Sequence, residues 1–355
     1  MKYARLAKEA QALDPTTKLI KKLAPDLMDE IVARAMVLEK ISVLQPVGRR
    51  ALAQRMRLSE REARVITDAL REAGLIDVTP AGMMLTNRAY ELIDSVRELV
   101  RNKLGLESME IQLQMLLHVE RVKIVPGNAD ESREVLSEIG RVAGVRLRKS
   151  VRDGSIVAVT GGTTVQQVAQ NIPRGQNIAV TVIPARGGLG QAVETQANTL
   201  AEEIADKLGG THRALYIPDS LTKDALRELI KLKEVSEPLE AVKRADVLLY
   251  GIARADDMAK NRLMNKSDRD EMIKKGATAE ALGFCFDAHG KFLSSASGLG
   301  IPIEAVESIP TVIGVAAGAR KAEAILAVTR HHKHDLLVID EGAATAIYDL
   351  IRKDR

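Results

Sequence analysis

Length, composition and charge limit the classes of protein to which this chain can belong. It has 355 residues, 46% of them hydrophobic, and a formal net charge of +4 at pH 7. This length exceeds one typical domain, so we expect two or more, with largely aliphatic cores because only 2% of the residues are aromatic. The single cysteine, Cys285, excludes an intrachain disulfide. No apolar run approaches the roughly 18 residues of a membrane span, and the first residues do not resemble a signal peptide. We therefore expect a soluble, cytoplasmic protein with no membrane partner.

Positive charge is concentrated in the first third of the chain. Residues 1–105 carry 19 basic and 14 acidic side chains, whereas the remaining residues carry 33 basic and 34 acidic ones. Such a basic segment favours a polyanionic partner for the first third. The excess is small, so charge alone does not identify the partner, and the pattern of residues in this segment is more informative.

The order of elements in residues 27–90 predicts a winged helix-turn-helix. The expected elements are helices over 27–43, 49–56 and 59–73, followed by short strands over 75–79 and 83–86. Apolar residues at helical spacing define the helices, and Pro46-Val47-Gly48 ends the first one. Ser59 and Glu62 form the pattern of a capping box at the start of the third helix, and Gly74 ends it. The two strands then form the ribbon, or wing.

The third helix of this domain is expected to read DNA. In a winged helix-turn-helix it lies in the major groove, where Arg61 and Arg64 could reach base edges and Thr67 lies on the expected polar face. Arg49 and Arg50 open the preceding helix and suit phosphate contacts. The alternative is a charged face on a small helical domain that contacts protein.

Residues 87–118 form a long helical stretch with an apolar seam, which Gly105 is expected to break. Such a seam on a linker buries itself against a second chain or a neighbouring domain, and we favour a homo-oligomer, either a dimer or a tetramer. The expected domains are therefore a DNA-binding domain over 1–90, a linker for oligomerisation over 91–118, and a ligand domain over 119–355.

The ligand domain is expected to be a doubly wound α/β fold. Strands are predicted over 156–160, 178–184, 213–217, 246–251, 312–316 and 335–339, and helices near 131–148, 163–171, 195–208, 221–232, 320–330 and 343–352. This alternation is typical of a parallel sheet covered on both faces. Ligands of such folds bind outside the carboxyl ends of the strands.

Gly161-Gly162-Thr163-Thr164 carries the strongest indication of a ligand. It joins a predicted strand to a predicted helix, where glycines let a ligand approach the backbone and the free N–H groups and the dipole favour phosphate. The alternative is a tight strand-to-helix turn with Thr as its N-cap.

Further strand-end loops carry compatible side chains. The loop 186–190 is rich in glycine and contains Arg186, whose guanidinium can fork onto phosphate. Lys321 falls in the first turn of a helix, where a cation is unfavourable unless an anion binds. Gln196 opens another helix and could bind a sugar hydroxyl or only solvent, and Asp340 could cap a helix.

Other polar clusters are interpreted without a ligand. His331, His332 and His334 sit among cations at a helix end, so we expect no metal site there. Asp256 and Asp257 are expected on a solvated helix face. The residues show no arrangement of a nucleophile with a base.

Six motifs, taken together, resemble the SorC family of sugar-responsive bacterial transcription regulators over nearly the whole chain. They are Pro46-Val47-Gly48-Arg49-Arg50, Gly161-Gly162-Thr163-Thr164, Pro184-Ala185-Arg186-Gly187-Gly188, Gln196-Ala197-Asn198-Thr199, Lys321-Ala322-Glu323-Ala324-Ile325 and Asp340-Glu341-Gly342-Ala343-Ala344.

The resemblance implies a DNA-binding repressor of glycolytic genes that is not an enzyme, and whose ligand domain is related to sugar-phosphate isomerases. It implies fructose 1,6-bisphosphate or a related phosphosugar as effector, with no cofactor and no metal. The effector pocket that it implies consists of Gly162, Thr163, Thr164, Arg186, Gln196, Glu280 and Lys321.

One departure and one alternative accompany this resemblance. Gly251-Ile252-Ala253 stands where the family has Gly-Ile-Gly, so an extra methyl group is expected in the pocket wall. The alternative function is a sugar-phosphate isomerase or deaminase with an accessory DNA-binding domain. Such an enzyme needs a placed acid or base, for which Glu280 and the pair Asp256 and Asp257 are the candidates.

Overall fold

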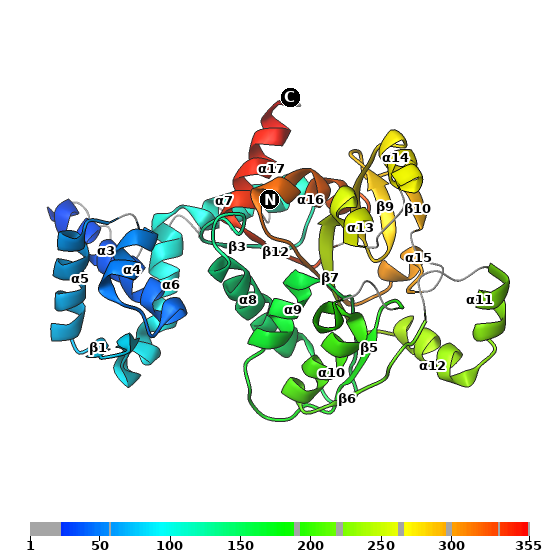
Figure 1. Ribbon diagram of the computed structural model, residues 1–355, viewed down its shortest axis with the longest axis horizontal. Helices are drawn as coiled ribbons and strands as arrows, with labels where there is room; N and C mark the ends of the chain where they lie inside the picture. Colours follow the sequence, from blue (N-terminus) through cyan, green and yellow to red (C-terminus); the bar gives the residue numbers. More distant parts are fainter. Residues whose placement is uncertain are drawn as a thin grey trace. The chain divides into compact units, whose positions relative to one another are not determined.

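The fold is described from a computed structural model, which comprises two compact units, residues 1–109 and 110–355 (Figure 1). The residues described are 23–56, 58–187, 192–217, 223–261, 266–295, 300–332 and 334–353. The boundary between the units falls inside the expected linker 91–118. The domain limits expected from the sequence stay a prediction.

The first unit contains the expected helices and ribbon in the expected order. Its elements are α3 (Pro25–Leu44), α4 (Arg49–Met56), α5 (Glu60–Glu72), β1 (Ile76–Thr79), β2 (Gly82–Leu85) and α6 (Asn87–Lys103). The capping box is present, because the Ser59 hydroxyl accepts from the Glu62 N–H at 3.2 Å and the Glu62 carboxylate accepts from the Ser59 N–H at 2.8 Å. The ribbon is held to the turn before α4 by paired backbone bonds between Val47 and Met83.

The next helix, α7 (Leu106–Leu117), begins directly after Gly105, whose φ of +69° gives the expected break. The apolar seam predicted over this stretch is not uniformly exposed. Leu92 is 44% exposed, whereas Leu106 and Leu113 are fully buried. The oligomeric state stays a prediction.

The second unit is built on a large sheet with a parallel centre. Its strands are β3 (Val122–Val125), β4 (Ile156–Val159), β5 (Thr181–Pro184), β6 (Thr211–His212), β7 (Val247–Arg254), β8 (Ala277–Ala281), β9 (Phe284–Asp287), β10 (Phe292–Ser295), β11 (Thr311–Val315) and β12 (Leu336–Asp340). Parallel pairing runs in the order β6-β5-β4-β7-β11-β12-β3. Beyond Gly251, β7 pairs with β8, and an antiparallel sheet continues through β9 to β10.

Helices cover both faces of the parallel centre, as a doubly wound fold requires (Figure 1). Their bounds are α8 (Glu134–Ser150), α9 (Thr163–Asn171), α10 (Ala197–Leu208), α11 (Lys223–Leu229), α12 (Lys233–Val242), α13 (Ala255–Asn261), α14 (Lys266–Lys274), α15 (Ile303–Val306), α16 (Ala322–Thr329) and α17 (Glu341–Lys353). Side chains of α8, α9 and α10 form one core with alternate strand residues such as Val157, Val247 and Leu249.

Several expected elements differ from the structure. The segment 213–217 is not a strand; β6 ends at His212, and the Asn198 side chain holds the following segment through two bonds to the Leu215 backbone. Among the described residues of the expected helix 221–232, α11 ends at Leu229, and the separate helix α12 follows it. The sequence interpretation missed β3 and the antiparallel strands β8, β9 and β10.

His332 and His334 are buried, although the sequence places them among cations at a helix end. His332 and His334 are 7% and 2% exposed, and both Nε2 atoms contact the hydroxyl of buried Tyr250 in β7. His334 Nδ1 donates to the His332 carbonyl, 2.8 Å away, so its Nε2 accepts from the Tyr250 hydroxyl. The Tyr250 oxygen then accepts from His332 Nε2–H at 2.9 Å. This order of donors requires the His334 ring to be neutral, and burial, which lowers the pKa of His332, favours a neutral His332 ring as well.

This cluster predicts acid-sensitive stability. Burial holds the pKa of His334 at about 4 and that of His332 well below its usual value near 6.5. Below pH 6.5 the unfolded chain therefore binds protons that the folded chain does not. The free energy of unfolding is expected to fall as pH drops from 6.5 toward 4, by up to about 2.7 kcal/mol per pH unit for two histidines.

Urea unfolding between pH 7.5 and 5 measures this slope, and long-range ¹H–¹⁵N spectra report the rings directly. At pH 5.5 we expect two neutral rings, one protonated on Nδ1 and one on Nε2. His212→Gln, which removes an exposed histidine of β6, should leave both signals in place. Two charged rings at pH 5.5 would contradict the assignment.

Candidate functional site

A cavity of about 800 Å³ opens where β7 changes its partner from β4 to β8. This volume lies within the range of small-molecule sites. Residues after β4 and β11 and at the end of β7 line it, as the rule for parallel sheets predicts, and residues of the antiparallel strand β8 complete the lining. Six of the seven expected effector residues are among them: Gly162, Thr163, Thr164, Arg186, Glu280 and Lys321. Their roles in binding stay predictions.

The two glycines between β4 and α9 have different tasks. A Cβ on Gly161 would lie 2.5 Å from the Thr195 carbonyl oxygen, so this glycine admits the protein's own backbone, not a ligand. Gly162 has a φ of +117°, and its N–H donates to the same Thr195 carbonyl at 2.9 Å. Gly162, not a threonine, is the N-cap of α9.

Thr163 and Thr164 are the first residues of α9 and line the cavity. The N–H groups of a first helical turn have no partner within the helix, so this turn can donate to an anion. The Thr163 side chain is exposed to the cavity, whereas Thr164 is 4% exposed. Thr163 is therefore the better placed hydroxyl for a ligand.

Arg186 and Glu280 form a buried ion pair in the cavity wall. Their side chains are 2% and 4% exposed, and Arg186 Nη1 lies 3.4 Å from Glu280 Oε1. A phosphate bound by Arg186, as expected from the sequence, would therefore compete with the Glu280 carboxylate for the same guanidinium. Glu280 belongs to β8 and faces Ala253 of β7 in the ladder, so the methyl group noted in the sequence lies in the cavity lining beside this pair. The rest of the glycine-rich loop, 188–190, lies outside the described residues.

Lys321 follows β11 and is the N-cap of α16. Its Nζ donates to the Ile252 carbonyl of β7 at 3.2 Å. Burial, together with the neighbouring Arg320 guanidinium, lowers the pKa of Lys321. A cation that is partly buried beside another cation at a helix start gains more from a bound anion than an exposed one does.

Asp340 organises the turn that carries Lys321. This fully buried carboxylate accepts from the N–H groups of Gly318 at 3.0 Å, Ala129 at 2.6 Å and Ala343 at 3.2 Å. It therefore caps α17, as considered from the sequence, and also ties together the loops that follow β3 and β11. Burial raises the pKa of Asp340.

Two parts of the site differ from the sequence-based set. Gln196 is the N-cap of α10 and is not among the described residues that line the cavity, although its neighbour Thr195 is. Charged lining residues that the sequence interpretation missed are Glu194, Lys260 and Arg320. Asp257 also lines the cavity and pairs with Arg320, and Asp256 pairs with Arg254, so the expectation of a solvated acidic face is wrong.

The expected DNA-contacting residues are only partly available in the first unit. Arg50, Arg61 and Arg64 have exposed side chains. Arg49 is half-buried and lies 3.4 Å from the Asp68 carboxylate, which competes with a phosphate. Thr67 is 1% exposed, and its hydroxyl donates to the Arg64 carbonyl at 3.2 Å, so its side chain does not belong to the polar face.

Comparison with known proteins decides the family. The family described as "CggR N-terminal DNA binding domain" matches residues 31–100, and the one described as "Putative sugar-binding domain" matches residues 102–349. The chain is 37% identical over 325 residues to the central glycolytic genes regulator of Bacillus subtilis. The aligned region covers 91% of this chain and 96% of that protein. The chain belongs to the SorC family of sugar-binding transcriptional regulators.

Further comparisons agree with this assignment. The central glycolytic genes regulator of Priestia megaterium is 35% identical over 91% of this chain and 95% of its own length. A solved structure of a SorC-family regulator from Enterococcus faecalis is 33% identical, covers 68% of this chain and 99% of its own, and superposes with a TM-score of 0.64. Full-length SorC of Klebsiella pneumoniae, 17% identical, shares the fold over 85% of this chain and 93% of its own with a TM-score of 0.63. No described helix is both long and apolar enough to cross a bilayer.

The close packing at Gly161 generates a prediction. A methyl group in Gly161→Ala would overlap the Thr195 carbonyl, so the backbone has to shift, and we expect a loss of about 1–3 kcal/mol in stability. Urea unfolding measures this loss. In Gly251→Ala, also in the cavity lining, the new methyl would meet Val165 at 3.5 Å, an ordinary contact, so this control should remain near wild-type stability. Equal stability of the two variants would contradict the packing argument.

Proposed function

We propose that this SorC-family regulator represses glycolytic genes and that a phosphorylated sugar, most simply fructose 1,6-bisphosphate, controls its binding to operator DNA. The observation that carries the proposal is the cavity at the start of α9, whose lining combines the first turn of this helix, the Thr163 hydroxyl and cationic side chains. The names of the curated relatives support the choice of glycolytic genes.

The charges of the cavity favour an anion with more than one phosphate. Its described lining holds four cationic side chains, Arg186, Lys260, Arg320 and Lys321, against three carboxylates, Glu194, Asp257 and Glu280. The α9 N-terminus adds partial positive charge at a separate position. A ligand with two phosphates can use the helix start and the side-chain cations together.

The ligand is sensed and not consumed. Isomerisation requires a carboxylate that is free to move a proton at the sugar. Glu280 is instead held by the Arg186 guanidinium, and Asp257 lies 3.0 Å from Arg320. Both carboxylates are better suited to fixing cations and accepting sugar hydroxyls. Fructose 1,6-bisphosphate incubated with the protein should therefore be recovered unchanged by NMR.

Binding of the effector is tested by Thr163→Ala. Loss of one hydrogen bond to a charged phosphate should weaken binding of fructose 1,6-bisphosphate by roughly 1.5–3 kcal/mol in calorimetry. Thr211→Ala is the matched control, since it removes an exposed hydroxyl of β6 outside the described lining. Undiminished affinity of Thr163→Ala would reject the assignment of the α9 start.

DNA recognition is tested on a duplex selected from random sequence by the full-length protein. Arg64→Ala should cost about 1–3 kcal/mol on this duplex and relax preference at one base pair. Arg50→Ala should weaken all duplexes alike and lower the salt slope by about one. Arg34→Ala, an exposed ion-paired residue of α3, serves as control.

Coupling of the two functions is tested by fluorescence anisotropy titration of this duplex with the protein, with and without saturating fructose 1,6-bisphosphate. The effector should weaken DNA binding, and by linkage the duplex should weaken effector binding by the same factor. Identical titration curves with and without the sugar would show two independent activities.

A further inference from the structure

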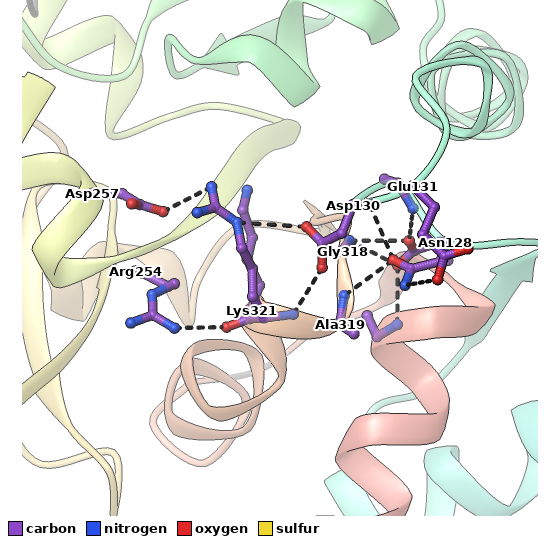
Figure 2. A network of polar contacts seen from close by, with 12 residues as sticks. Asn128, Asp130, Glu131, Arg254, Asp257, Gly318, Ala319 and Lys321 are labelled. Atoms are coloured by element: carbon purple, nitrogen blue, oxygen red, sulfur yellow. Dashed lines mark hydrogen bonds and ion pairs between the residues drawn. The ribbon is translucent and has the colours of Figure 1, made fainter.

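Arg320 is a cationic residue of the cavity lining that the sequence interpretation did not assign to the site. It belongs to the short helix η2 (Ala319–Lys321), directly after the turn that ends β11. Its guanidinium lies between two carboxylates from distant parts of the chain, those of Asp130 and Asp257, which Figure 2 labels. Arg320 Nε lies 3.5 Å from Asp130 Oδ1, and Arg320 Nη2 lies 3.0 Å from Asp257 Oδ2.

The backbone of Arg320 is fixed from both sides. Its N–H donates to Asp130 Oδ2 at 3.1 Å, and its carbonyl accepts from Arg254 Nη1 at 3.1 Å. The Asp256 carboxylate in turn holds Arg254 with bonds of 2.9 and 3.1 Å. Gly318 has a φ of +97°, and a Cβ there would lie 2.4 Å from Asp130, so the turn and the Asp130 loop fit only with glycine (Figure 2).

The guanidinium is less constrained than this backbone. The Arg320 side chain is 57% exposed, whereas the side chains of Asp130 and Asp257 are 31% and 23% exposed. Its two counter-ions contact different nitrogens of the group, Asp130 at Nε and Asp257 at Nη2. Nη2 also carries an N–H that faces Nη1, so a ligand can engage Nη1 and Nη2 while Asp130 stays at Nε.

We propose that Arg320 selects effectors with a second phosphate, and that this phosphate replaces Asp257 on the Arg320 guanidinium while Asp130 keeps its hold. The proposal rests on the phosphosugar function proposed above. A guanidinium forks onto phosphate with two parallel bonds, and a doubly charged phosphate is a stronger counter-ion than a carboxylate. In the ligand-free protein, Asp257 therefore acts as an internal competitor for the same donor.

The competition predicts variants with opposite effects. Arg320→Gln removes the fork and should weaken binding of fructose 1,6-bisphosphate by about tenfold or more, that is about 1.4 kcal/mol or more. Asp257→Asn keeps the shape but removes the competing charge from the cavity, so bisphosphate binding should tighten by several-fold. The better bound of the two monophosphates, fructose 6-phosphate or fructose 1-phosphate, should change by less than about twofold in either variant, because it occupies the α9 start.

Calorimetry with these three sugars on the full-length protein is the test, with thermal unfolding to check that each variant is folded. Arg227→Gln is the matched control, because Arg227 is exposed on α11 and pairs with Asp224 outside the described lining. A purely structural role of the ion pair would make Arg320→Gln and Asp257→Asn weaken all three sugars alike, and that result overturns the proposal.

The same data separate this proposal from the function on which it rests. If Thr163→Ala weakens all three sugars while Arg320→Gln leaves the bisphosphate preference intact, the cavity binds phosphosugars and the role of Arg320 is wrong. If the wild-type protein binds none of the sugars, both proposals fail.

Discussion

The second unit depends on one buried carboxylate at the carboxyl edge of its sheet. Asp340 ends β12 and receives N–H groups from three loops, those at Ala129, Gly318 and Ala343. Without it these buried donors would have no acceptor, at a cost of about 1–3 kcal/mol each. The turn at Gly318 carries Arg320 and Lys321 into the cavity, so the cationic side of the pocket is placed by a residue that does not line it.

The pocket itself forms because β7 is longer than its parallel neighbours. It pairs with β4 through Leu249 and then with β8 from Ile252 onward. The strand that leads into α9 therefore pairs with the first part of β7, and the strand that carries Glu280 pairs with its last part. The parallel part of the sheet thus contributes the glycine turn before α9 to the cavity, and the antiparallel strand β8 contributes the side that carries Glu280.

Local patterns predicted well where structure is decided locally. The three helices and the ribbon of the first unit follow from apolar periodicity and from the Ser59 capping box, and the strand-to-helix turn at Gly161 follows from its own four residues. The expectation that Thr67 lies on the polar face of α5, which rests on its hydroxyl, is wrong. Its position, four residues after Ala63 and three before Leu70, places it on the buried stripe.

The misses concern partners that are remote in the sequence. The neutral state of His332 and His334 depends on Tyr250, about 80 residues away, and a local pattern of cations concealed it. Asp257 pairs with Arg320, which lies 63 residues further on, so its place in the cavity could not be read from its own neighbours. The strand β8 contains the small and polar run Ala-Thr-Ala-Glu-Ala, which lacks the apolar alternation by which strands are recognised.

The internal pairing of the pocket charges has a thermodynamic consequence. Arg186 binds Glu280, Arg320 binds two aspartates, and Lys321 binds a main-chain carbonyl before any ligand arrives. Ligand binding is therefore an exchange of counter-ions, whose net free energy is a difference between two similar sets of bonds. Small inorganic anions gain little from such an exchange because they cannot satisfy several cations at once. A larger polyanion that spans the cavity can, so under the proposed function this set of internal ion pairs favours the organic ligand over free phosphate.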